Sequence, residues 1–90
     1  MKLTAQQLKQ AEEWAGLLYS PKEIAIIMEL DMSAFESEFA DESSAVHLAV
    51  MRGKLRSEGE IRKSIISLAK DGSASAQEQA MKLVDKYNFL

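Results

Sequence analysis

The chain has no cysteine, and its 90 residues include only one histidine, one proline and one tryptophan. The missing cysteines exclude disulfides, thiolate zinc sites and cysteine nucleophiles, and the single His47 excludes any site that needs two imidazoles. No apolar run approaches the length of about 18 residues that a membrane-spanning helix needs. The N-terminal segment also lacks the apolar centre of a signal peptide. We therefore expect a soluble intracellular protein with no membrane partner.

Apolar side chains recur at spacings of three and four residues in every long segment, which is typical of helices, and no useful length alternates as a strand does. Two pairs, Thr4 with Gln7 and Ser20 with Glu23, have the composition of capping boxes and predict helix starts just after Thr4 and Ser20. The expected helices span residues 5–17, 21–29, 33–40 and 44–70, and a final helix follows residue 73. The predicted fold class is all-α.

The helices are expected to form two segments of one compact domain. Residues 1–42 would be a three-helix unit of the helix-turn-helix kind. Residues 43–90 would hold one long helix and a C-terminal helix that folds back as an αα-hairpin, a possible oligomerisation region, because Asp71-Gly72 is a helix stop followed by a short connection. Tyr87 and Phe89 are expected to cap the core of this hairpin.

Two glycines lie inside the long helix, where each costs about 1 kcal/mol relative to alanine. Gly53 and Gly59 therefore indicate a close backbone approach or a kink. We expect any break in the long helix at Gly59.

The net charge of −3 is unevenly distributed along the chain. Residues 1–42 hold three cations and nine anions, a charge of −6, whereas residues 43–90 hold eight cations and five anions, a charge of +3. Opposite charges on the two halves would attract neighbouring copies and favour a head-to-tail homo-oligomer. Chance segregation of charge in a small domain explains the same distribution equally well.

No arrangement of residues points to catalysis. The adjacent carboxylates of Glu12 and Glu13 do not face each other on a helix, so they are poorly placed to share acid–base work. His47 stands between two apolar residues near a helix start, where a surface or partly packed histidine is expected. No multi-glycine phosphate loop is present. The sequence therefore predicts a non-enzyme with no catalytic residue, no metal site and no cofactor.

Five cations within twelve positions of the long helix form a basic stretch that is a candidate for contacting DNA phosphates in a salt-sensitive, sequence-independent way. These candidates are Arg52, Lys54, Arg56, Arg62 and Lys63. Two alternatives stay open for the same residues. They could form a solvated helix face, with an i,i+4 pair between Glu58 and Arg62, or they could dock against the acidic half of a neighbouring copy.

Residues 19–30, YSPKEIAIIMEL, followed by Phe35, resemble the helix-turn-helix of small terminase subunits from tailed phages and prophages. Ala25, Met28, Leu30 and Phe35 stand where that pattern has its small and hydrophobic residues. The segment from Gly53 through IRKSI to LAKDGS is similar to the region that follows the helix-turn-helix in this group.

The resemblance implies a protein that recognises viral DNA, assembles into a ring-like oligomer and hands the DNA to a large ATPase–nuclease subunit in the bacterial cytoplasm. It implies no chemistry for the small subunit itself. The recognition helix would span residues 33–40, with Ser33, Glu36 and Ser37 as candidate contacts to DNA. Glu29 stands at the turn position that usually holds glycine, which predicts a different backbone path or a longer connection.

The expected recognition helix has an acidic character that favours a second hypothesis. It carries Glu36 and Glu38, is followed by Asp41 and has no arginine or lysine. Carboxylates are repelled by phosphates, although a glutamate can accept a hydrogen bond from cytosine. The alternative function is therefore an acidic helical protein–protein interaction module that binds a basic partner and has no nucleic-acid role.

Overall fold

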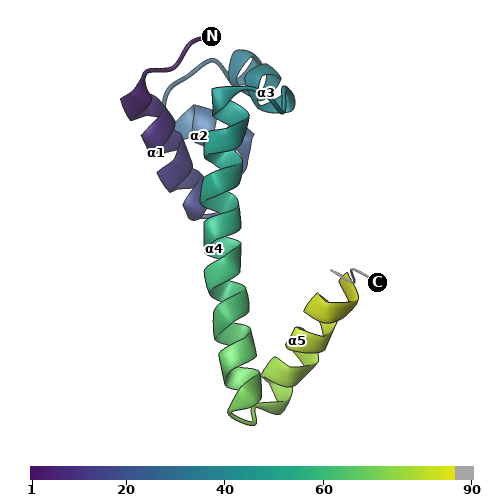
Figure 1. The fold of residues 1–90 in the computed structure, drawn as a ribbon. Helices are drawn as coiled ribbons and strands as arrows, with labels where there is room; N and C mark the ends of the chain where they lie inside the picture. Colours follow the sequence, from purple (N-terminus) through teal and green to yellow (C-terminus); the bar gives the residue numbers. More distant parts are fainter. Residues whose placement is uncertain (87–90) are drawn as a thin grey trace. The chain divides into compact units, whose positions relative to one another are not determined.

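A computed structural model describes residues 1–86, which form five α-helices and no strand (Figure 1). The all-α prediction is confirmed for these residues. Tyr87 and Phe89, the expected caps of a C-terminal hairpin core, lie outside them. The helices are α1 (Ala5–Gly16), α2 (Pro21–Ile27), α3 (Met32–Ala40), α4 (Ala45–Lys70) and α5 (Ala74–Lys86).

Side-chain caps fix the starts of the first three helices. The Thr4 hydroxyl accepts from the Gln7 amide at 3.1 Å, and the Gln7 side chain accepts from the Thr4 amide at 2.9 Å. Ser20 and Glu23 form the same reciprocal pair at 3.2 and 2.9 Å. The Asp31 carboxylate caps α3 at 2.8 Å. These bonds confirm both predicted capping boxes. Each box provides hydrogen-bond partners for amides at the helix start that have no partner inside the helix.

The chain forms two compact units, Met1–Ser57 and Glu58–Leu90, here called unit 1 and unit 2. The division falls inside α4, whereas the sequence places a boundary at residues 42 and 43, in the loop between α3 and α4. The reason for the difference is packing. The first turns of α4 contribute Val46 and Val50 to the same core as α1, α2 and α3, so they belong to unit 1.

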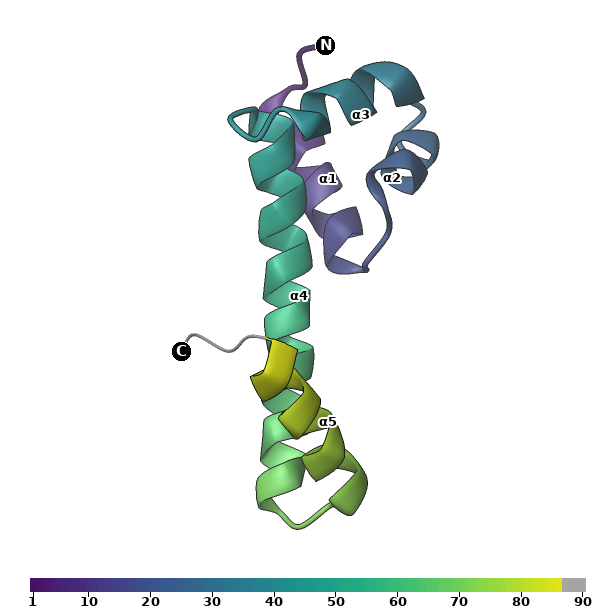
Figure 2. The ribbon, with the colours of Figure 1, turned by 90° about the vertical axis from the view of Figure 1, so that its right-hand side faces the viewer.

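Ile24 and Phe35 are the largest fully buried side chains of the described residues, and both lie in unit 1. Small residues surround them, among them Ala11 and Ala15 of α1 and Ala25 of α2. In both views α3 lies beside the start of α4 (Figure 2). The core is thus built from the apolar stripes that the helical spacing predicts.

The turn between α2 and α3 is short, and Glu29 adopts a left-handed backbone conformation with a φ of 57°. The Leu30 amide donates to the Ala25 carbonyl at 2.8 Å, and the Glu29 amide donates to the Ile26 carbonyl at 3.1 Å. These two bonds define a Schellman motif, in which the left-handed position usually holds glycine. The predicted different path or longer connection is therefore wrong, because Glu29 takes the conformation that glycine would take.

Gly53 and Gly59 differ in their surroundings. A Cβ built at Gly53 would lie 2.0 Å from the Glu12 carbonyl oxygen, so α1 and α4 touch through their backbones there and the predicted close approach is confirmed. Nothing lies within 4 Å of a Cβ at Gly59, and α4 continues through it. The predicted break at Gly59 is wrong, because continuous hydrogen bonding on both sides offsets the cost of about 1 kcal/mol for one glycine.

In unit 2 the last turns of α4 lead into α5 through a three-residue turn. Gly72 has a φ of 97°, and the Ser73 amide donates to the Leu68 carbonyl at 3.1 Å, which ends α4 as the sequence predicts. The Ser73 hydroxyl accepts from the Ala76 amide at 3.2 Å and starts α5. Ala76 is buried beside this turn. A hairpin packed along its whole length stays a prediction.

Candidate nucleic-acid interface

All five predicted phosphate contacts lie on α4, but they belong to two different units. Arg52, Lys54 and Arg56 are in unit 1, and Arg62 and Lys63 are in unit 2. Within unit 1, Arg52 and Arg56 lie one helical turn apart and face α1. Lys54 lines a different cavity, formed with residues of the α1–α2 connection. The structure therefore brings Arg52 and Arg56 together on one surface and places Lys54 on another.

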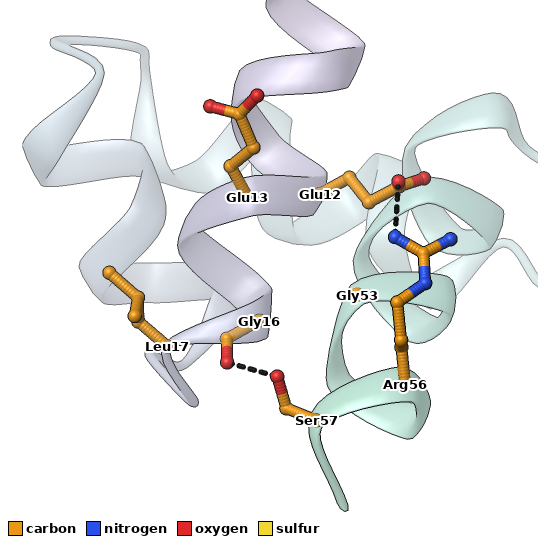
Figure 3. Close-up of a pocket in the computed structure, with 7 residues that line it drawn as sticks. All are labelled: Glu12, Glu13, Gly16, Leu17, Gly53, Arg56 and Ser57. Carbon is orange, nitrogen blue, oxygen red and sulfur yellow. Dashed lines mark hydrogen bonds and ion pairs between the residues drawn. The ribbon is translucent and has the colours of Figure 1, made fainter. Parts of the chain in front are cut away.

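The two arginines share one carboxylate, that of Glu12 on α1. Nη1 of Arg52 donates to Oε1 of Glu12 at 2.9 Å, and Nη1 of Arg56 donates to Oε2 at 3.1 Å. The arginine side chains are 57% and 59% exposed, whereas that of Glu12 is 19% exposed. Each guanidinium uses only one nitrogen in these bonds, so its remaining N–H groups stay available. Figure 3 shows the bond from Arg56 to Glu12.

The hydrogen bond from Arg52 has the largest effect on the pKa of Glu12 and lowers it. Burial has the next largest effect and raises the pKa, but the hydrogen bond from Arg56 and the charges of both arginines lower it further, so that the pKa is lowered overall. Glu12 is therefore ionised throughout the neutral range. Two guanidinium cations and one carboxylate leave this group, which we call the Arg–Glu–Arg cluster, with a net charge of +1.

The close crossing of α1 and α4 positions this cluster. Gly53 lets the two backbones meet, and the Ser57 hydroxyl donates a hydrogen bond to the Gly16 carbonyl oxygen (Figure 3). A cavity of about 270 Å³ lies at this crossing, with Glu12, Gly53 and Arg56 among its lining residues. A neighbouring cavity is lined by Lys9, Glu12 and Arg52. Two arginines of α4 thus hold the Glu12 carboxylate, and Lys9 of α1 lines the cavity beside it.

The remaining predicted contacts are arranged separately. In unit 2, Nη2 of Arg62 lies 3.7 Å from Oε2 of Glu58, which confirms the predicted i,i+4 pair. Lys63 is exposed. The alternative of a solvated helix face therefore applies to Arg62, because its ion pair with Glu58 reduces the positive charge that it presents to DNA.

The three residues proposed for a recognition helix, Ser33, Glu36 and Ser37, are all exposed on α3. At the end of this helix, hydrogen bonds from the Ser43 hydroxyl and amide hold the pKa of Asp41 below its usual value. Because α3 carries carboxylates and no cation, it presents an acidic, hydroxyl-bearing face. Such a face supplies no attraction for phosphates.

His47 is half-buried, as the sequence predicts for a partly packed histidine. Its Nδ1 lies 2.8 Å from the Phe39 carbonyl oxygen, and its ring centroid lies 5.0 Å from that of Phe39. This nitrogen is therefore engaged in joining α3 to α4. Among the residues that the structure describes, no three His, Asp or Glu side chains gather as a metal site would require.

Comparisons of the chain with protein families, with curated proteins and with solved structures found no match. None of the helices within residues 1–86 combines the length and apolar content that crossing a membrane requires.

Sequence reasoning missed two members of this surface, Lys9 and Glu12. The partners of Glu12 lie some 40 residues away, since the bond from Arg52 to Glu12 spans 40 positions. The available signal was the pair of glycines at residues 16 and 53, because small residues permit close helix approach. That signal indicates a crossing but does not say which charged side chains meet there.

Proposed function

We propose that this protein is a non-enzymatic DNA-binding protein that resembles the small terminase subunits of tailed phages. The observation that carries the proposal is the α2–α3 connection. Its four residues, Met28–Asp31, separate two capped helices, and a short turn of this kind joins the helices of a helix-turn-helix. Ala25 and Phe35 are fully buried, and Met28 and Leu30 are partly buried against the same core.

The proposal divides the work between two surfaces. Ser33, Glu36 and Ser37 on α3 are candidates for contacting base edges, because hydroxyls can bond to several bases and a glutamate can accept from cytosine. Phosphate affinity has to come from cations outside α3. Arg52 and Arg56 are exposed and adjacent, so they are the phosphate contacts that we favour, with Lys9 beside them.

We further propose that the protein assembles into a homo-oligomer that acts with a large terminase subunit in the bacterial cytoplasm. Charge drives this oligomerisation more weakly than the charges of residues 1–42 and 43–90 indicate, because the two structural units divide the chain at a different place. Unit 1 holds six cations and nine anions, a charge of −3, and unit 2 holds five of each, a charge of zero. Apolar surface supports association better, since a unit below about 40 residues rarely stabilises itself. Among the described residues of unit 2, the large apolar side chains that are exposed are Ile61, Ile66, Leu68, Met81 and Val84.

A mobility-shift titration with duplex DNA at about 50 and 200 mM salt tests the DNA-binding function. We expect binding that weakens steeply with salt, because each neutralised phosphate releases counterions. The double variant Arg52→Ala/Arg56→Ala should bind more weakly and show a shallower salt dependence. The control is Lys70→Ala/Lys82→Ala, which removes the same charge elsewhere and should keep most of the affinity. Absence of binding at the lower salt concentration would exclude the proposal.

The acidic face of α3 supports a second candidate, an interaction module for a basic protein. In that case the wild-type protein would show no binding of duplex DNA at 50 mM salt but would bind a lysine-rich peptide. The variant Glu36→Gln would then weaken peptide binding. The same variant would leave a DNA complex unchanged or strengthen it, so the two functions predict different responses.

A further inference from the structure

The Arg–Glu–Arg cluster has the form of an occupied anion site. Guanidinium groups bind carboxylate and phosphate oxygens through the same N–H donors. Here the two oxygens of Glu12 are each bound by a different arginine, at 2.9 and 3.1 Å. A phosphodiester also has two unesterified oxygens, so it can bridge the same pair of arginines in the same manner.

The bound carboxylate belongs to Glu12 and not to its neighbour. Figure 3 shows the Glu13 side chain pointing away from Arg56, on the other side of α1. Glu13 is exposed, and it lines the same cavity without an ion pair to either arginine. The two adjacent glutamates therefore carry equal charge but differ in their relation to the arginines, which provides a matched comparison.

The carboxylate is held in a way that permits exchange. Ion pairs whose arginines are largely exposed contribute little to stability, because water solvates the separated charges well. Both guanidinium groups are more than half exposed, so an incoming anion can reach them without unfolding the crossing. The Glu12 side chain, which is 19% exposed and does not belong to the hydrophobic core, would have to rotate away from the arginines.

We propose that Glu12 acts as an internal competitor for DNA phosphate, occupying the Arg52–Arg56 pair in the free protein and giving way to a phosphodiester when DNA binds. This inference rests on the proposed DNA-binding function. It adds that the Arg52–Arg56 pair is the phosphate site and that Glu12 limits the affinity of the protein for DNA. The carboxylate reduces the charge that the pair offers to DNA from +2 to +1. Removing it should therefore strengthen binding at this position.

The test compares Glu12→Gln with Glu13→Gln in salt titrations of duplex DNA binding. We expect Glu12→Gln to raise the affinity for DNA about tenfold at 0.1 M salt. For each phosphate contact, the affinity falls with the salt concentration to about the power 0.9, so one added contact is worth about a factor of ten at 0.1 M. Its salt dependence should also become steeper by about one. Glu13→Gln removes the same charge and should change the affinity by less than about threefold, because only a long-range charge effect remains.

A second comparison places Glu12→Gln in the Arg52→Ala/Arg56→Ala background. There its effect should fall to that of Glu13→Gln, because no paired arginines remain to be released. Far-ultraviolet circular dichroism and Trp14 fluorescence check that each variant is folded.

The outcomes separate the inference from the function on which it rests. Equal gains for Glu12→Gln and Glu13→Gln, or a loss for Glu12→Gln, would overturn the competitor role while leaving DNA binding in place. Binding by Glu12→Gln but not by the wild type at 50 mM salt would overturn both the function and the exchange, because Glu12 would then block the arginines without giving way to DNA. No binding by either protein at 50 mM salt would overturn both proposals.

Discussion

Gly53→Ala tests whether the crossing of α1 and α4 is as close as the structure has it. The added methyl group would lie 2.0 Å from the Glu12 carbonyl oxygen, 3.0 Å from the Glu12 carbonyl carbon and 3.1 Å from the Gly16 nitrogen. All three are backbone atoms, so no side-chain rotation can relieve the clash. Ordinary contact begins near 3.4 Å, which requires α1 and α4 to separate by more than an ångström.

The separation should cost more than the substitution gains. Overpacking of this kind typically costs about 1–3 kcal/mol, and the helix preference of alanine over glycine returns about 1 kcal/mol. Here the clash is with backbone, so we expect the upper part of that range and a net loss of roughly 1–2 kcal/mol. Unit 1 is small, and proteins have only about 0.05–0.15 kcal/mol of stability per residue, so this is a large fraction of the total.

Two other glycines serve as controls for the same substitution. At Gly16 an added Cβ would meet the Ser57 hydroxyl oxygen at 3.4 Å, an ordinary contact. Gly16→Ala should therefore leave the stability of unit 1 nearly unchanged. At Gly59 the space is open, and Gly59→Ala should increase the helical stability of α4 by up to about 1 kcal/mol.

Urea unfolding measures these differences. Trp14 of α1 is the single tryptophan of the chain and reports on unit 1, and circular dichroism reports on all five helices. A Gly53→Ala variant as stable as Gly16→Ala, by Trp14 fluorescence, would refute the close crossing. It would also remove the basis for the contact between Glu12 and the two arginines.

Two further predictions concern pH and assembly. Because the pKa of Glu12 is lowered in the folded state, its contribution is fully present above the ordinary glutamate pKa of about 4.3 and is lost as pH falls through the lowered value. Urea midpoints of the wild type should thus fall slightly more than those of Glu12→Gln between about pH 5 and pH 2, and a larger fall for Glu12→Gln would contradict the ion pairs. The second prediction is that association through unit 2 persists at high salt in light scattering and is reduced by Ile66→Gln/Val84→Gln. Dissociation at high salt would instead indicate charge-driven head-to-tail contacts.

The caps that start the first three helices and the glycine that ends α4 were determined by the local sequence. Thr4, Ser20 and Asp31 each bond to a backbone amide three residues away, and Gly72 ends α4 through its own left-handed conformation. Such interactions are complete within one turn of chain, so residue type and spacing suffice to predict them. The same locality explains why the all-helical fold could be predicted.

Only the tertiary structure decided how the charges are used. At the end of α2, Glu29 adopts the left-handed backbone conformation that glycine usually takes there, because the surrounding core fixes the turn. The pairing of Glu12 with Arg52 and Arg56 depends on how α1 and α4 are rotated and how closely they cross at Gly53. Those quantities follow from packing across 40 or more residues of chain, and no local spacing encodes them.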